Sequence, residues 1–281
     1  MLTRIITAAV LIVVIGLGIW LKGWVLRAIL LIAMLVATDE MYRALEKAGY
    51  RPERWVGYIY CVLAVAIQAC GALVGGVFQV IDPPLFSLTA GVMLGISVIV
   101  LRGRVDFDGL VSTLFPMVYP GLLFSLIVAL QDLGSPPAAT LALILTFFIA
   151  SVNDTFALFV GLSLGRHRLS PEISPKKSIE GSIGGLIAAM LFAMLAPVVA
   201  AKVWPSAASI AWPPLWAFAL LGLLAGGLSQ IGDLAASLVK RHCGIKDFGN
   251  IFPGHGGMMD RFDGILFCGA ACYLFFKLMG L

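Results

Sequence analysis

The sequence predicts an all-α, polytopic membrane protein with about nine transmembrane helices. Of its 281 residues, 60% are hydrophobic and only 12% are charged, and the mean hydropathy is +1.02. This composition excludes an ordinary soluble protein, and it excludes a disordered chain because disorder requires low hydrophobicity and high net charge. Nine spans of roughly 20 residues leave about 100 residues for loops and ends. We therefore expect a single membrane-embedded domain over residues 1–281.

Apolar runs between charged or Pro/Gly breaks give the position of each span. The basic tip before the first run is also typical of a signal peptide, but the run is long and further apolar segments follow it directly, so we interpret it as a span. The predicted spans are 5–21, 24–38, 56–80, 85–101, 110–130, 138–163, 182–201, 213–236 and 262–280.

The charges of the loops predict the orientation. The N-terminal tip and four loop segments together hold 15 of the 19 Lys and Arg residues. By the positive-inside rule, the N-terminus and these loops face the cytoplasm, and an odd number of spans places the C-terminus outside. We expect a multi-pass protein of the cytoplasmic (inner) membrane. The four basic loop segments are 39–55, 102–108, 166–180 and 240–261.

Two carboxylates inside apolar stretches, Asp154 and Asp233, indicate where the chemistry lies, because intramembrane charges are costly. Ser229, Asp233, Ser237 and Lys240 are spaced i, i+4, i+8 and i+11, so they share one face of a helix. A structural polar pair between helices, a helix-end acid in water, or an ion site of a transporter would also explain these acids.

The loop Lys240–Asp263 continues this polar face and interleaves basic residues, acids and glycines. Glycines let the backbone approach a ligand and expose N–H groups, basic side chains neutralise phosphate, and acids hold a divalent cation. The pattern predicts a polyphosphate–metal site, although a solvated charged face would share single features of it.

The segment 166–181 has the same character. Two prolines predict an extended chain, and Lys176, Lys177 and Ser178 precede a glycine-rich helix start at 181–185, whose free N–H groups favour anions. The positive-inside signal alone would account for the lysines. No nucleophile triad or G-x-x-x-x-G-K-[ST] loop is present, which favours transfer to a phosphate oxygen that is already anionic.

The pattern Ser237-x-x-Lys240-Arg241-x4-Lys246-Asp247-x-Gly249, followed by Pro253-x-His255-Gly256-Gly257-x-x-Asp260-Arg261-x-Asp263, resembles the signature of the phosphatidate cytidylyltransferases. Asp154-Thr155 and Ser174-Pro175-Lys176-Lys177-Ser178-x-Glu180-Gly181 resemble the other characteristic region of that family. These motifs cover about 151–185 and 229–264, so the motif-bearing catalytic part is 151–264. Leu158 and Ser178 depart from the family's usual residues, but neither departure removes a charge.

The resemblance implies transfer of CMP from CTP to phosphatidic acid, giving CDP-diacylglycerol and pyrophosphate for phospholipid biosynthesis. It implies a Mg²⁺ requirement, with K⁺ often assisting, and CTP, phosphatidic acid and the lipid bilayer as partners. It implies no nucleic-acid partner and is compatible with a homodimer. The implied catalytic residues are Asp233, Asp260, Lys240 and Arg241. The implied metal ligands are Asp233 and Asp260, with Asp154 as a further candidate. The implied substrate and phosphate ligands are Lys176, Lys177, Ser178, Ser237, Lys246, His255, Gly256, Gly257 and Arg261.

Other classes remain as alternatives. A different membrane phospho-head-group transferase is disfavoured, because Asp108-Gly109 and Asp263-Gly264 are not followed by the Ala-Arg of the CDP-alcohol phosphotransferases, and the chain has no Asp-Asp pair. A cation-coupled transporter would use Asp154 and Asp233 as ion sites but would leave the glycine-rich loop without a role. A lipid scaffold without catalysis would leave the whole charged site unexplained.

Overall fold

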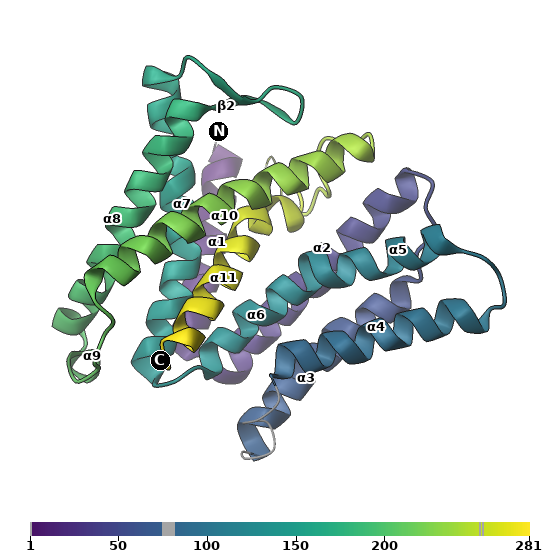
Figure 1. Ribbon diagram of the computed structural model, residues 1–281, viewed down its shortest axis with the longest axis horizontal. Helices are drawn as coiled ribbons and strands as arrows, with labels where there is room; N and C mark the ends of the chain where they lie inside the picture. The colour runs from purple at the N-terminus through teal and green to yellow at the C-terminus, as the bar shows by residue number, and fades with distance from the viewer. Residues whose placement is uncertain (1, 75–81, 253, 255) are drawn as a thin grey trace. The chain divides into compact units, whose positions relative to one another are not determined.

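The computed structural model describes residues 2–74, 82–252, 254 and 256–281, and most of this chain is helical (Figure 1). The all-α class is confirmed, and a helix covers the main part of every predicted span. The helices are α1 (Leu2–Leu21), α2 (Gly23–Lys47), α3 (Arg54–Val74), α4 (Pro83–Leu101), α5 (Phe107–Pro116), α6 (Leu123–Ala129), α7 (Pro136–Leu164), α8 (Ile179–Val203), α9 (Pro205–Ala208), α10 (Leu215–His242) and α11 (Met259–Leu278).

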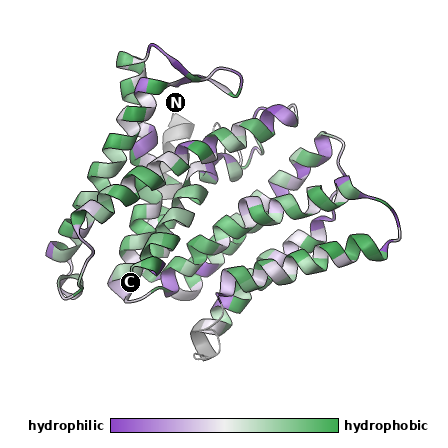
Figure 2. Cartoon of the chain, viewed as in Figure 1, coloured by the Kyte–Doolittle hydropathy of each residue, from purple (hydrophilic) through white to green (hydrophobic). Residues whose placement is uncertain are grey.

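Six segments of the described chain are long and apolar enough to cross a membrane, which confirms the membrane class. Figure 2 shows the apolar residues along the helices and hydrophilic residues at a small hairpin between α7 and α8. The six segments are Arg54–Gly71, Pro83–Leu101, Phe107–Asp132, Pro136–Leu164, Ile179–Val203 and Leu215–His242. The helices α1, α2 and α11, which cover the other three predicted spans, are not among them.

The predicted loop 39–55 is wrong in its first half, because α2 continues to Lys47. The residues after the predicted span end are mainly strong helix formers such as Glu, Met, Ala, Leu and Lys. An ion pair of 2.5 Å between Arg43 Nη2 and Asp39 Oδ2, four positions apart, adds local support. The helix therefore carries charged residues beyond its apolar part.

The described chain divides into two compact units. Unit 1 comprises Met1–Ala129 and Val239–Phe262, and it contains α1 to α6, the end of α10, the glycine-rich loop and the start of α11. In this unit the Tyr42 hydroxyl on α2 donates to the Thr113 carbonyl on α5 at 2.9 Å. Pro116 and Pro120 interrupt the helix between α5 and α6, since proline removes a backbone donor.

Unit 2 comprises Leu130–Leu238 and Asp263–Leu281. Its helices α7 and α8 pack along each other, and the antiparallel strands β1 (Arg168–Ser170) and β2 (Ser174–Ser178) connect them (Figure 1). The predicted extended conformation of this connection is confirmed. Gly181 and Gly185 lie against the α7 backbone at Ala157 and Asn153, where a Cβ atom would overlap a carbonyl oxygen. These two glycines thus allow α7 and α8 to approach closely.

Candidate functional site

A cavity with a volume of about 520 Å³ lies in unit 2. It brings together five residues that the sequence predicted for the site: Asp154, Lys176, Lys177, Ser178 and Asp233. They come from α7, β2 and α10, so the helices of the two intramembrane aspartates meet, as the sequence interpretation required. Its wall also includes Arg168, Ser182, Gln230 and apolar or glycine residues of α7.

An ion pair dominates the electrostatics of this cavity. Lys177 Nζ lies 2.5 Å from Asp233 Oδ2, and the Asp233 side chain keeps 33% of its surface exposed. Three cationic side chains, from Arg168, Lys176 and Lys177, face two acidic ones, from Asp154 and Asp233. A wall of this kind can neutralise a phosphate with its basic groups while its carboxylates remain available to a metal cation.

A buried polar network, which was not predicted, includes two residues of the cavity wall. Gln230 Nε2 donates to Asn153 Oδ1 at 2.9 Å and to the Ser182 carbonyl at 3.1 Å, and the Ser182 hydroxyl donates to Gln230 Oε1. Asn153 is completely buried and Gln230 nearly so. The network ties α7, α8 and α10 together beside the two aspartates. Their positions in the sequence could have pointed to these residues, because Gln230 precedes Asp233 by about one helical turn and Asn153 adjoins Asp154.

The start of α8 differs from the expectation of free N–H groups. The Ser178 hydroxyl accepts the Gly181 N–H at 3.2 Å, which caps the helix. Glu180 accepts from the N–H groups of Arg166 and His167 at 3.0 and 3.3 Å, and it pairs with His167 Nδ1 at 2.6 Å. The protein's own side chains therefore order this helix start and anchor the hairpin to it.

Asp260 is the centre of a second cluster, in unit 1. Its Oδ1 accepts a hydrogen bond from the Lys240 ammonium at 2.8 Å, and its Oδ2 accepts the N–H groups of Phe248 and Gly257 at 2.8 and 2.9 Å. The Asp260 side chain is only 4% exposed. Both carboxylate oxygens thus have protein donors, and they connect α10, the glycine-rich loop and α11. The Gly257 N–H, which was predicted to face phosphate, points to Asp260 instead.

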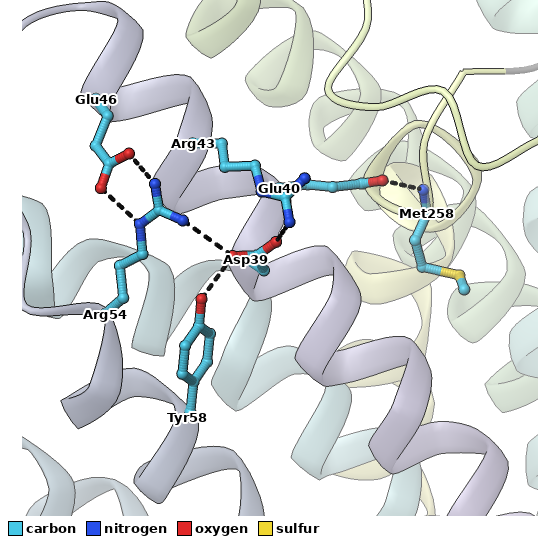
Figure 3. Close-up of polar contacts among 7 residues, drawn as sticks. All are labelled: Asp39, Glu40, Arg43, Glu46, Arg54, Tyr58 and Met258. Carbon is cyan, nitrogen blue, oxygen red and sulfur yellow. Dashed lines mark hydrogen bonds and ion pairs between the residues drawn. The ribbon is translucent and has the colours of Figure 1, made fainter.

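Glu40 on α2 belongs to the same cluster and was missed. It is 3% exposed, and its two carboxylate oxygens accept the N–H groups of Met258 and Met259 at 3.0 and 2.8 Å. Figure 3 shows the contact with Met258. Burial raises the pKa of Glu40, and the two N–H groups offset part of this effect. The sequence offered little signal, because Glu40 lies among other charged residues of α2, which were all assigned to a basic loop.

The remaining predicted residues lie along α10 and around the loop. Because α10 is a continuous helix to His242, the predicted polar face is present. Ser237 on that face is half-buried. Arg241, Lys246 and Arg261 are exposed. Gly256 has a φ of +79° and accepts the Phe252 N–H at 3.0 Å. His255, like Pro253 of the same motif, lies outside the described residues.

The two clusters fit a divalent cation to different degrees. No group of three or more His, Cys, Asp or Glu side chains gathers in the described part of the chain. Mg²⁺ does not need one, since it commonly uses one or two carboxylates together with water and substrate phosphates. Asp233 fits this role because it is partly exposed in the cavity. A cation at Asp260 Oδ1 would have to displace the Lys240 ammonium.

Comparison with known proteins identifies the family. The sequence profile of the Cytidylyltransferase family matches residues 2–279. This chain belongs to the cytidylyltransferase family. It is 29% identical to "Phosphatidate cytidylyltransferase 4, chloroplastic" of Arabidopsis thaliana over 94% of this chain and 72% of that protein. It is 33% identical to a phosphatidate cytidylyltransferase of Bacillus subtilis over 64% of this chain and 63% of the relative. The family resemblance predicted from the motifs is confirmed.

Proposed function

We propose that this cytidylyltransferase transfers CMP from CTP to phosphatidic acid and produces CDP-diacylglycerol and pyrophosphate. The observation that carries the proposal is the unit 2 cavity, in which the Lys177–Asp233 ion pair lies among two further basic side chains. Both substrates are phosphates, and such a wall can bind them. The names of the Arabidopsis and Bacillus relatives support the same reaction.

The chemistry asks little of the protein beyond orientation and charge neutralisation. A phosphate oxygen of phosphatidate attacks the α-phosphorus of CTP, a new P–O bond forms, and the bond to the β-phosphate breaks to release pyrophosphate. Lys176, Lys177 and Arg168 would neutralise the phosphate oxygens. Their electrostatic attraction to the leaving group strengthens as negative charge builds up on it during the reaction. Arg241, Lys246 and Arg261 of unit 1 are proposed as further phosphate ligands.

Mg²⁺ is the proposed cofactor, and K⁺ is proposed as an assisting cation. Asp233 would hold the Mg²⁺, with Asp154 of the same cavity as a further candidate ligand. Asp260 is proposed as a ligand in its own unit. When bound, the divalent cation would supply charge neutralisation at the phosphate oxygens. Asp260→Asn is expected to abolish turnover in a folded protein, and an active variant would contradict the assignment.

The proposed topology has nine spans, with the N-terminus and the basic loops in the cytoplasm, where CTP is available. The three spans beyond the six named above are proposed to be α1, α2 and α11, whose apolar parts match the predicted spans. Phosphatidate would remain in the bilayer with its head group at the cavity. Cysteine labelling of Ser170→Cys in the hairpin and Ser206→Cys in α9 tests the orientation. An impermeant reagent added to intact cells should label only the α9 position.

The proposed reaction is tested with purified protein in detergent. The protein is incubated with CTP labelled at the α-phosphate and with phosphatidic acid, with and without Mg²⁺, and label is followed into the lipid phase. Mg²⁺-dependent labelling of lipid together with pyrophosphate release is the expected result. Folded protein that transfers no label would contradict the proposal and would favour a transporter or another head-group transferase.

A further inference from the structure

We propose that Glu40 is a positioning residue that fixes the glycine-rich loop and the start of α11 for CMP transfer. The predicted effect of Glu40 on the rate of CMP transfer rests on the proposed function. The structural part of the inference concerns unit 1 alone, where α2, the described residues of the loop between α10 and α11, and the first turn of α11 lie.

The geometry of the Glu40 carboxylate is that of a helix cap supplied from a distant part of the chain. The first N–H groups of a helix have no partner within it. Glu40 Oε1 and Oε2 accept the N–H groups of Met258 and Met259, so each oxygen serves one donor at the beginning of α11. The carboxylate charge also lies at the positive end of the helix dipole. The cap sets where α11 begins, and therefore where Asp260 and Arg261 lie.

Glu40 and Asp260 together hold the loop at four backbone N–H groups. Asp260 accepts from Phe248 and Gly257, and Glu40 accepts from Met258 and Met259. Lys240 contributes its ammonium to Asp260, so a residue of the signature is held by the same arrangement. Without the Glu40 contacts, Asp260 would still hold Phe248 and Gly257, but the N–H groups of Met258 and Met259 would lose their acceptor.

Two glycines of the signature are explained by Glu40. A Cβ atom at Gly249 or at Gly257 would overlap Oε1 of the Glu40 carboxylate. Neither glycine has a positive φ, so backbone conformation does not demand glycine at these positions. The close approach of the carboxylate explains them, because a Cβ atom at either position would displace Glu40 from its contacts. The contact with Glu40 thus accounts for two glycines of the motif, although Glu40 lies more than 200 positions away in the sequence.

The position of Glu40 is itself fixed by its neighbours on α2. Asp39 contacts Arg43 on its own helix and both Arg54 and Tyr58 on α3, so α2 is joined to α3 on the side next to Glu40 (Figure 3). A cavity of about 370 Å³ separates part of this network from the loop at Phe248–Ile251. The loop therefore has room to move if the Glu40 contacts are lost.

A purely stabilising role is the rival explanation. Burying a carboxylate is costly, and an exposed Ser, Thr or Asp at the helix start would cap α11 without that cost. Neither oxygen is left without a backbone donor, which also makes Glu40 unlike a metal ligand. Placement of the loop explains why the cap comes from α2.

The test compares Glu40→Gln with Glu46→Gln, a matched change on the same helix at an exposed carboxylate. Glutamine keeps the size of the side chain but presents an NH₂ group to one of the two N–H donors. Hydrogen–deuterium exchange in detergent should show at least about tenfold faster exchange in peptides covering 248–260 of Glu40→Gln only. The kcat for CMP transfer should fall about ten- to a hundredfold, with a much smaller change in the KM for phosphatidic acid.

Three results would overturn the proposal: wild-type exchange in 248–260, a kcat equal to that of Glu46→Gln, or faster exchange spread evenly over α2, α3 and α11. If Glu40→Gln does not fold, Gly249→Ala supplies the second variant, because its Cβ displaces the same carboxylate, and it should give the same local exchange and the same loss of kcat. If even wild-type protein transfers no CMP, the proposed function fails, while the exchange data still decide whether Glu40 holds the loop.

Discussion

The carboxylates of the two units differ in the kind of group that pairs with their oxygens. In unit 2, Asp233 faces a cavity and is one-third exposed, with the side-chain ammonium of Lys177 as its ion-pair partner. In unit 1, Glu40 and Asp260 are buried and accept backbone N–H groups at fixed positions. A side-chain partner can be exchanged for a ligand, whereas backbone donors hold a loop in place. The first arrangement suits substrate and cation binding, and the second suits positioning. Asp260 combines the two, because its Oδ2 accepts backbone N–H groups while its Oδ1 pairs with the Lys240 side chain, which a cation could replace.

Within the unit 2 cavity, the largest expected effect is at Asp233. Asp233→Asn should lower kcat/KM for CTP by about a thousandfold or more, because the proposed cation ligand and the partner of Lys177 are removed together. Steady-state transfer of labelled CMP measures the change. Glu172→Gln, at an exposed carboxylate in the β1–β2 turn, is the control and should retain activity. Similar losses in both variants would contradict a specific role for Asp233.

Lys177→Gln should have the next largest effect. Loss of one charge-assisted phosphate contact is expected to lower kcat/KM for CTP by about a hundredfold. Lys202→Gln, near the opposite end of α8, is the matched change and should have little effect. Wild-type kinetics for Lys177→Gln would show that the Lys177–Asp233 pair is only structural.

Gln230→Leu should act mainly on stability. It removes the donor shared by Asn153 and Ser182 and leaves buried polar atoms without a partner, which costs about 1–3 kcal/mol. Thermal unfolding in detergent measures the loss. Thr140→Ala is the control, because the exposed Thr140 hydroxyl donates to the Pro136 carbonyl of its own helix, and it should change stability by no more than about 0.5 kcal/mol. An unchanged melting temperature for Gln230→Leu would contradict the role of the network.

The smallest effect is expected at Arg54 in unit 1. Its pairs with Asp39 and Glu46 are partly exposed, so Arg54→Gln should cost about 0.2–1 kcal/mol. The difference from wild type should shrink at high salt, because exposed ion pairs are screened. Thermal unfolding at two salt concentrations checks this. A large, salt-independent loss would place Arg54 among the groups that fix the loop.

Sequence patterns predicted the helices well, because hydropathy marks apolar spans directly. They also pointed to residues that the structure places around one cavity in unit 2, because charges inside apolar runs are rare. Asp154 and Asp233 were identified from this contrast alone. Glu40 and the Gln230 network were missed for the opposite reason. Glu40 lies among other charged residues, and its significance arises only from contact with N–H groups far away in the chain. Gln230 is uncharged, so it gives a weak signal in a single sequence. The glycines were found, but close packing against Glu40 and α7 explains several of them better than phosphate contact does.

The distinction between a ligand-binding and a positioning carboxylate is tested most directly by cation binding. Mn²⁺ can replace Mg²⁺ as a paramagnetic probe, and its binding to the purified protein in the presence of CTP can be measured by electron paramagnetic resonance. We expect Asp233→Asn to lose the protein-bound Mn²⁺ signal and Glu40→Gln to retain it at wild-type affinity. Retention of Mn²⁺ by Asp233→Asn, or its loss in Glu40→Gln, would contradict the assignment of the two carboxylates.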